Sequence, residues 1–165
     1  LIRPYKNVPH LITTFADAAI ARSVLLIAGK PFDQALEQEI EATARAASGA
    51  DVRLALGHIA TEDVQRYFLA ADLVALPYRR ILNSGAVILA LGFGRPVLVP
   101  DKGSMAEHRE DYGDNWIRLY GGELGPEDLR SALAWARETQ RPALDLGHLE
   151  WSELAVRTKA VYESL

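Results

Sequence analysis

Strand-length apolar runs alternate with helix-length amphipathic stretches along almost the whole of this 165-residue chain. Continuous apolar runs that end in glycine or proline are typical of strands buried on both faces of a parallel sheet. The strict alternation of such runs with helical stretches predicts a doubly wound, Rossmann-like α/β fold with about six parallel strands. One strand is expected to end near Ile2, and the others are expected at Ser23–Gly29, Val52–Leu56, Asp72–Pro77, Arg95–Pro100 and Asn115–Tyr120.

The stretches between these runs are expected to form helices on both faces of the sheet. Thr61 and Ser84 are expected N-caps, and Pro126 occupies a first helical position. No repeat or internal boundary is visible, so residues 1–165 are expected to form a single domain. The predicted helices are Asp33–Ser48, Thr61–Ala71, Ser84–Phe93, Pro126–Thr139 and a long C-terminal helix at Leu149–Leu165.

Composition excludes several classes of function. The net charge of −4 argues against a nucleic-acid partner, and the absence of cysteine excludes disulfides, thiolate metal sites and a thiol nucleophile. The four histidines lie far apart, so no metal site is expected. No apolar stretch approaches the roughly 20 residues that span a bilayer, and without a signal peptide the expected location is cytoplasmic. Because the first residue is Leu1, we expect a piece of a longer protein.

The loop after the predicted Asp72–Pro77 strand is the first candidate site. Ligands of such sheets bind at the carboxyl ends of the strands. If Ser84 caps the following helix, the first backbone N–H groups point into the loop, and Gly85 lets an anion approach them. A second interpretation is a capped helix whose Gly85 packs closely against the sheet, and the residues alone leave both open.

A second candidate lies in the first loop, where Arg3 and Lys6 precede a helix that begins near Asn7. If the first strand neighbours the Asp72–Pro77 strand, Lys6 can reach the anion held at Ser84. The alternative is a pair of solvated cations at the end of a strand.

Several segments, in this order, resemble a known family: "LIRPYKNVPHLITTF", "LLIAGKP", "DLVALPYRRILNSGAVILALGFGRPVLVP" and "GSMAE". They are similar to the carboxyl-terminal, donor-binding half of GT-B-fold retaining glycosyltransferases. This large family includes bacterial mannosyl- and glucosyltransferases of cell-surface polysaccharide synthesis.

The resemblance implies that the chain binds a nucleoside-diphosphate sugar and transfers the sugar to a saccharide or lipid-linked acceptor. It implies no metal and no cofactor beyond the donor itself. The acceptor would bind to a separate amino-terminal half, so this chain alone is expected to be inactive. The full enzyme is expected to make peripheral contact with the inner membrane.

The resemblance also assigns residues. Lys6 and Arg3 are expected to be catalytic, because they would neutralise the departing diphosphate. Lys6 matches the lysine at the donor diphosphate, and the amides of the Ser84-Gly85 turn match those that meet the distal phosphate. The expected donor-binding residues are Tyr78, Arg79, Asn83, Ser84, Gly85 and Glu107.

The chain departs from the family at two glutamates. The family places one near the transferred sugar and one on the ribose hydroxyls, and here these positions are Leu82 and Ala90. Alanine accepts no hydrogen bond, so backbone and other side chains are expected to hold the nucleotide. The alternatives are a sugar-nucleotide epimerase of the same architecture and a catalytically silent module that serves a partner protein.

Overall fold

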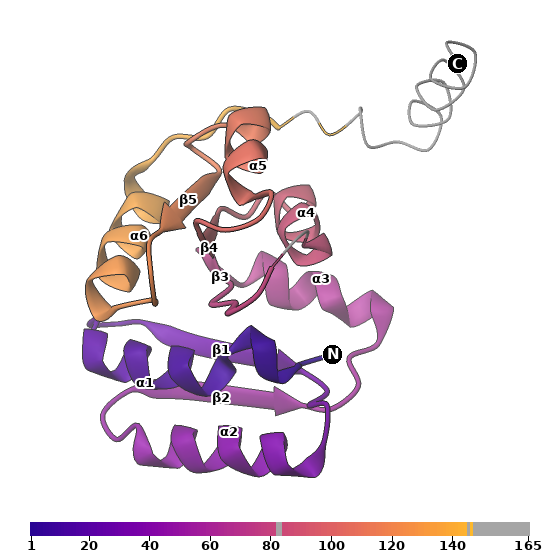
Figure 1. Cartoon of the computed structure of the whole chain (residues 1–165), viewed down its shortest axis with the longest axis vertical. Helices are drawn as coiled ribbons and strands as arrows, with labels where there is room; N and C mark the ends of the chain where they lie inside the picture. The colour runs from indigo at the N-terminus through magenta and orange to yellow at the C-terminus, as the bar shows by residue number, and fades with distance from the viewer. Residues whose placement is uncertain (82–83, 145, 147–165) are drawn as a thin grey trace.

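Parallel strands alternate with helices in this computed structural model, which describes residues 1–81, 84–144 and 146 (Figure 1). The predicted α/β class is therefore confirmed. The C-terminal helix expected at Leu149–Leu165 lies outside the described residues, as do Leu82 and Asn83. The strands are β1 (Val24–Gly29), β2 (Asp51–Leu56), β3 (Val74–Ala75), β4 (Val97–Pro100) and β5 (Ile117–Tyr120). The helices are η1, a 3₁₀ turn (Pro4–Lys6), α1 (Val8–Ala18), α2 (Gln34–Ala46), α3 (Thr61–Leu69), α4 (Gly85–Gly92), α5 (Met105–Tyr112) and α6 (Pro126–Glu138).

The described strands form two hydrogen-bonded parallel sheets, with orders β1-β2 and β3-β4-β5. The described residues contain five strands rather than the expected six or so. The strand expected near Ile2 is a single parallel bridge to Pro31, in which the Ile2 N–H donates to the Lys30 carbonyl at 2.7 Å. A ladder needs several consecutive residues, and Ile2 is the second residue of this sequence.

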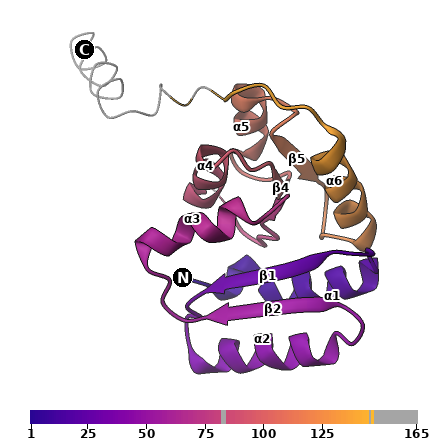
Figure 2. The same cartoon turned by 180° about the vertical axis from the view of Figure 1, so that it is seen from behind.

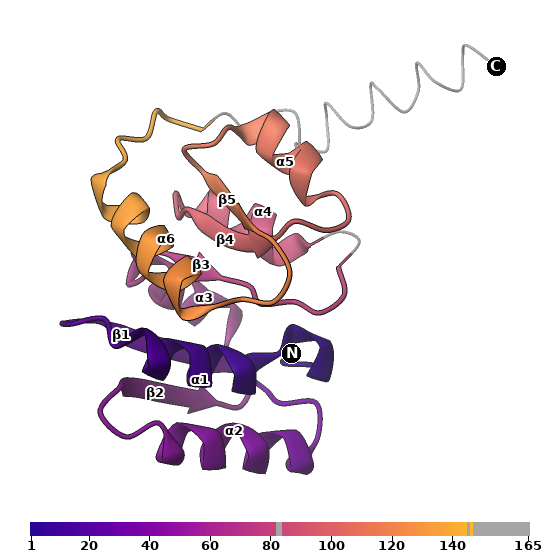
Figure 3. The same ribbon diagram turned by 60° about the vertical axis from the view of Figure 1, so that its left-hand side comes forward.

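Helix packing joins the two sheets. Helix α1 packs against α2 and against α6. Figures 1 and 3 show α1 beside β1 and α6 beside β5. In Figure 2, which shows the molecule from behind, α4 and α5 lie over the second sheet. The α1–α6 contact therefore ties the β1-β2 half of the molecule to the β3-β4-β5 half.

Two clusters of buried apolar side chains form the core. One gathers the inner face of α1 with β1 and includes Ile12, Ile27 and Leu98. The other lies between α4 and the second sheet, around Val87 and Ile117. Strand β4 is buried at every position and contributes to both clusters, as expected of a strand with neighbours on each side.

The described helix starts differ in whether a side chain caps them. The Asp33 carboxylate accepts the Leu36 N–H at 2.8 Å and caps α2. Thr61 was predicted to cap α3, but it is the first residue of that helix. Ala60 takes the N-cap position in an extended conformation and supplies no side-chain bond. No helix in the described part of the chain is long and apolar enough to cross a membrane.

A candidate anion-binding pocket

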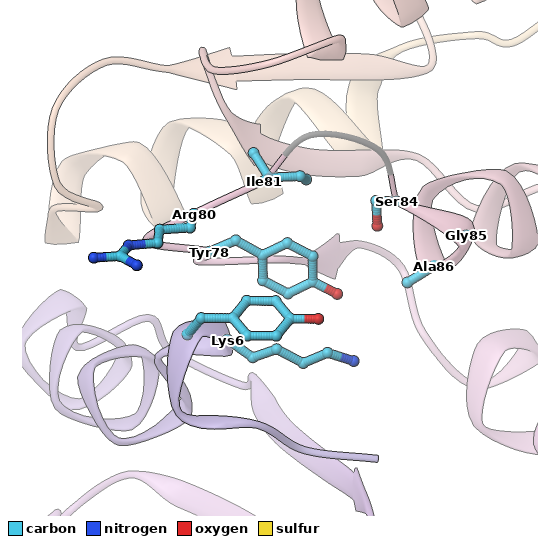
Figure 4. Close-up of a pocket in the computed structure, with 8 residues that line it drawn as sticks. Lys6, Tyr78, Arg80, Ile81, Ser84, Gly85 and Ala86 are labelled. Atoms are coloured by element: carbon cyan, nitrogen blue, oxygen red, sulfur yellow. The ribbon is translucent and has the colours of Figure 1, made fainter.

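A pocket of about 480 Å³ opens between η1 and the segment that runs from β3 to α4 (Figure 4). It therefore lies at the carboxyl end of β3, the edge at which ligands of parallel sheets bind. Aromatic rings, cations and the start of a helix form its wall. The lining residues are Tyr5, Lys6, Tyr78, Arg80, Ile81, Ser84, Gly85 and Ala86.

Two contacts hold η1 against the loop after β3. The Arg79 N–H donates to the Tyr5 carbonyl at 2.8 Å, and the rings of Tyr5 and Tyr78 meet edge to face with centroids 5.7 Å apart. Asn7 then turns the chain into α1 with a left-handed φ of 55°, a conformation that asparagine tolerates well. Ile2, at the start of this segment, pairs with Pro31 just after β1. The two contacts of Tyr5 then bring the neighbouring Lys6 to the pocket.

Lys6 is half-buried and its ammonium lies 5.6 Å from the centroid of the Tyr78 ring. Burial, and then the nearby charge of Arg3, lower the pKa of Lys6 from its ordinary value. Both effects penalise the charged ammonium at this position. An anion in the pocket would relieve this penalty, because attraction between opposite charges is stronger where water is excluded.

Helix α4 begins at the pocket with open amide groups. Ser84 is its N-cap residue, as predicted, and its carbonyl accepts the Val87 N–H at 3.0 Å. Its side chain makes no capping bond. Among the described residues, the N–H groups of Gly85 and Ala86 have no acceptor. Unpaired N–H groups at a helix start favour an anion.

Gly85 has no structural requirement for glycine. Its φ is not positive, and a Cβ built at this position would meet no atom of the described neighbouring residues within 4 Å. The interpretation that Gly85 packs closely against the sheet is therefore wrong. The absent side chain instead leaves space in the pocket beside the free amides.

The remaining predicted site residues lie outside this lining. The guanidinium of Arg3 lies over the Phe32 ring, with Cζ 5.4 Å from the ring centroid. Arg79 is exposed. Glu107 is exposed in the first turn of α5, and Asn83 is outside the described residues. The roles assigned to these four residues stay predictions, as do those of Lys6, Tyr78, Ser84 and Gly85.

Two lining residues, Tyr5 and Ile81, were not predicted, whereas Arg80 and Ala86 belong to the loop and the helix start at which the site was expected. Tyr5 is the chain neighbour of Lys6, and that adjacency was the available signal. The guanidinium of Arg80 points away from Ser84 and Gly85, whereas the Lys6 ammonium and the Tyr78 hydroxyl point toward that end of the pocket (Figure 4).

Leu82 and Ala90 occupy the two positions at which the resemblance implies glutamate. Leu82 is outside the described residues, whereas Ala90 is fully buried in the apolar cluster under α4. The Ala90 side chain therefore offers no group to a ligand. Within residues 1–81, 84–144 and 146, no group of three or more histidine, aspartate or glutamate side chains is arranged to hold a metal ion.

The sequence matches known proteins over most of its length. The family model described as "Glycosyl transferases group 1" matches residues 1–136. Two relatives from Xanthomonas campestris pv. campestris, both named GDP-mannose:glycolipid 4-beta-D-mannosyltransferase, are 35% and 34% identical over 155 residues. The alignments cover 93% of this chain and 44% of each relative, so the chain spans less than half of their length.

Proposed function

Because the chain belongs to the family described as glycosyl transferases group 1, we propose that it is the donor-binding part of a glycosyltransferase. Its substrate in this proposal is a nucleoside-diphosphate sugar, and its pocket holds the diphosphate. The observation that carries the proposal is the convergence of the Lys6 ammonium and the free amides of Gly85 and Ala86 on one pocket.

The chemistry of this proposal depends on charge stabilisation. When the bond between the sugar and the diphosphate breaks, negative charge develops on the leaving phosphate oxygen. Lys6 and the positive end of α4 lie where they would stabilise that charge, and such electrostatic stabilisation is usually the largest catalytic contribution. We propose that this route needs neither a metal ion nor a further cofactor.

The names of the relatives suggest which substrates to test first. Those proteins carry GDP-mannose and a glycolipid in their names. We propose a guanosine-diphosphate donor and a lipid-linked acceptor for the longer protein, with the acceptor bound outside this chain. A lipid-linked acceptor would bring that protein to the inner surface of the membrane.

The nucleoside would be held without the family's ribose carboxylate. Since Ala90 is buried and apolar, we propose that backbone groups and other side chains at the pocket rim hold the ribose. The family match favours a transferase over the epimerase. The silent module is the second candidate, and the missing carboxylate favours it.

A calorimetric titration of the 165-residue chain with GDP and UDP tests the proposal. We expect weak binding, with a dissociation constant below about 1 mM for at least one nucleotide. Lys6→Met should weaken it at least about tenfold, because a charge-assisted contact contributes about 1.5–3 kcal/mol. Lys30→Met, at an exposed lysine outside the pocket, is the matched control and should leave the affinity unchanged.

The same titration at increasing pH checks which group binds. Only the protonated amine attracts the diphosphate, so affinity should fall as the pH rises through the lowered pKa of Lys6, before the ordinary value of 10.5 is reached. In Lys6→Met this decrease should be absent. Failure of the wild-type chain to bind either nucleotide at millimolar concentration would contradict the proposal and favour the silent module.

A further inference from the structure

Tyr5 presents an exposed aromatic ring at the pocket. It lines the pocket beside Lys6 and is 40% exposed, whereas Tyr78, the other aromatic lining residue, is only 6% exposed. Within the described part of the chain, the one ring contact of Tyr5 is the edge-to-face contact with Tyr78. Such a contact uses at most one face of a ring, so a face of Tyr5 is accessible to a ligand.

We propose that Tyr5 binds the transferred sugar of the donor by stacking its ring against an apolar C–H face of a pyranose. This inference rests on the proposed function, because it assigns a sugar subsite within the same pocket. It also assigns the aromatic contact with the donor to Tyr5 rather than to Tyr78, which was expected to bind the donor.

The order of groups in the donor selects the sugar as the ring that reaches Tyr5. In a nucleoside-diphosphate sugar the pyranose is bonded directly to the phosphate that leaves, whereas the second phosphate and the ribose separate that phosphate from the nucleobase. The proposed function assigns the leaving phosphate to Lys6 and to the amides of Gly85 and Ala86. The Lys6 ammonium and the Tyr5 ring both lie against the Tyr78 ring, 5.6 and 5.7 Å from its centroid. The ring of the donor nearest to Tyr5 is therefore the sugar.

The wall of the pocket suits a sugar that carries a phosphate. Lys6 and the open amides of Gly85 and Ala86 form a polar part, whereas the half-buried Ile81 and the Tyr5 ring are apolar. A pyranose carries hydroxyls around its rim and C–H groups on its faces, so it can stack on an aromatic ring while its rim stays hydrated. Tyrosine suits this contact, because its body is apolar and its hydroxyl is polar.

The backbone of η1 fixes the position of the Tyr5 ring. The Lys6 N–H donates to the Arg3 carbonyl at 2.9 Å, and the Tyr5 carbonyl accepts the Arg79 N–H at 2.8 Å. Pro4 also restricts the backbone immediately before Tyr5. A ring held in this way loses little conformational freedom on binding, so more of its contact with a sugar is realised as affinity.

Titration of the 165-residue chain with GDP and with GDP-mannose tests this role. Tyr5→Leu removes the aromatic ring but keeps an apolar side chain beside Tyr78. We expect its affinity for GDP-mannose to fall about three- to tenfold, the range that burial of one ring face contributes, while its affinity for GDP stays unchanged. The ratio of the two affinities is the readout, because an effect on the diphosphate that both ligands share cancels in it.

Two further variants serve as controls. Tyr5→Phe keeps the ring and should keep the affinity ratio of the wild-type chain. Tyr67→Leu makes the same substitution at a half-buried tyrosine of α3, outside the pocket lining, and should leave both affinities unchanged. The unchanged affinity of Tyr5→Leu for GDP shows that this variant is folded with an intact diphosphate site.

The outcomes separate the sugar-binding role from the proposed function. If the wild-type chain binds both ligands and Tyr5→Leu leaves the ratio unchanged, the sugar-binding role is overturned and the proposed function stands. This holds also where Tyr5→Leu weakens both ligands equally, because Tyr5 then acts on the diphosphate site. The role is likewise overturned if Tyr5→Phe changes the ratio as much as Tyr5→Leu, or if the wild-type chain binds GDP alone. If the wild-type chain binds neither ligand, the proposed function fails, and the role of Tyr5 fails with it.

Discussion

Gly85 lies, at the scale of one residue, at a position where the fold does not require glycine but the proposed anion site does. Its backbone is in an ordinary conformation, and there is open space around it. A side chain at this position would project into space that an anion needs to reach the helix amides. The fold would tolerate the added methyl group, whereas anion binding would not.

Gly85→Ala should therefore bind GDP about tenfold or more weakly, with a free energy of unfolding that is unchanged or raised by roughly 0.4–1 kcal/mol. The measurements are calorimetric titration and urea denaturation. Gly92→Ala is the matched control in the same helix, because the new Cβ makes only an ordinary contact of 3.9 Å with Leu146. Unchanged GDP affinity in Gly85→Ala would argue against anion approach at this amide.

At the scale of the element, α2 and α4 use their N-terminal residues for different purposes. The Asp33 carboxylate caps α2 by accepting the Leu36 N–H, and this helix packs against α1 away from the pocket. Ser84 occupies the same position in α4, but its side chain makes no capping bond. Capping stabilises α2, whereas α4 keeps open amides at the pocket.

Asp33→Ala should lower the free energy of unfolding by about 0.5–2 kcal/mol, because the Leu36 N–H loses its acceptor. Urea denaturation measures this loss. Asp33→Asn keeps a side-chain oxygen at the cap and should retain most of the stability. Neither variant should alter GDP affinity, and a loss of affinity in Asp33→Ala would show that α2 influences the pocket.

At the scale of the whole molecule, the pocket lies where the two hydrogen-bonded halves meet. Lys6 belongs to the N-terminal segment, which bonds to the end of β1 through Ile2, whereas Gly85 follows β3 of the second sheet. A ligand that binds both Lys6 and Gly85 would oppose any opening that separates the halves. The free energy of binding such a ligand adds to the stability of the state in which the two halves are in contact.

Saturating GDP should therefore slow amide hydrogen exchange in β1 and in β3 together, although neither strand lines the pocket. At a ligand concentration 100 times the dissociation constant, protection against such an opening should increase about 100-fold. Mass spectrometry of peptides from both strands measures the effect. Slower exchange confined to the start of α4 would show that the ligand does not join the halves.

Sequence pattern predicted the fold well where burial is periodic and local. The predicted strand at Val52–Leu56 and the observed β2 differ by one residue, because an apolar run in a parallel sheet marks its own ends. Strand β3 is shorter than the predicted Asp72–Pro77, since only Val74 and Ala75 find partners in the neighbouring β4. Pairing depends on a neighbour distant in sequence, which the run itself does not contain.

Part of the candidate site was also predictable from the sequence. The chemistry of Lys6 and of the Ser84-Gly85 turn indicated an anion, and the structure brings these residues to one pocket. The edge-to-face contact between the rings of Tyr5 and Tyr78 was not predictable. It depends on the contact between η1 and the loop after β3, and these segments are more than 70 positions apart in the chain.

The two-sheet arrangement also affects how the chain reaches its native state. In the three strand pairs, partner residues are 27, 23 and 20 positions apart in sequence. Closing loops of this length costs little conformational entropy, so each sheet can assemble from consecutive segments. The pocket, in contrast, needs η1 to meet residues beyond β3. It is therefore expected to form after both sheets, because its loop is longer than the loop of any of these three strand pairs.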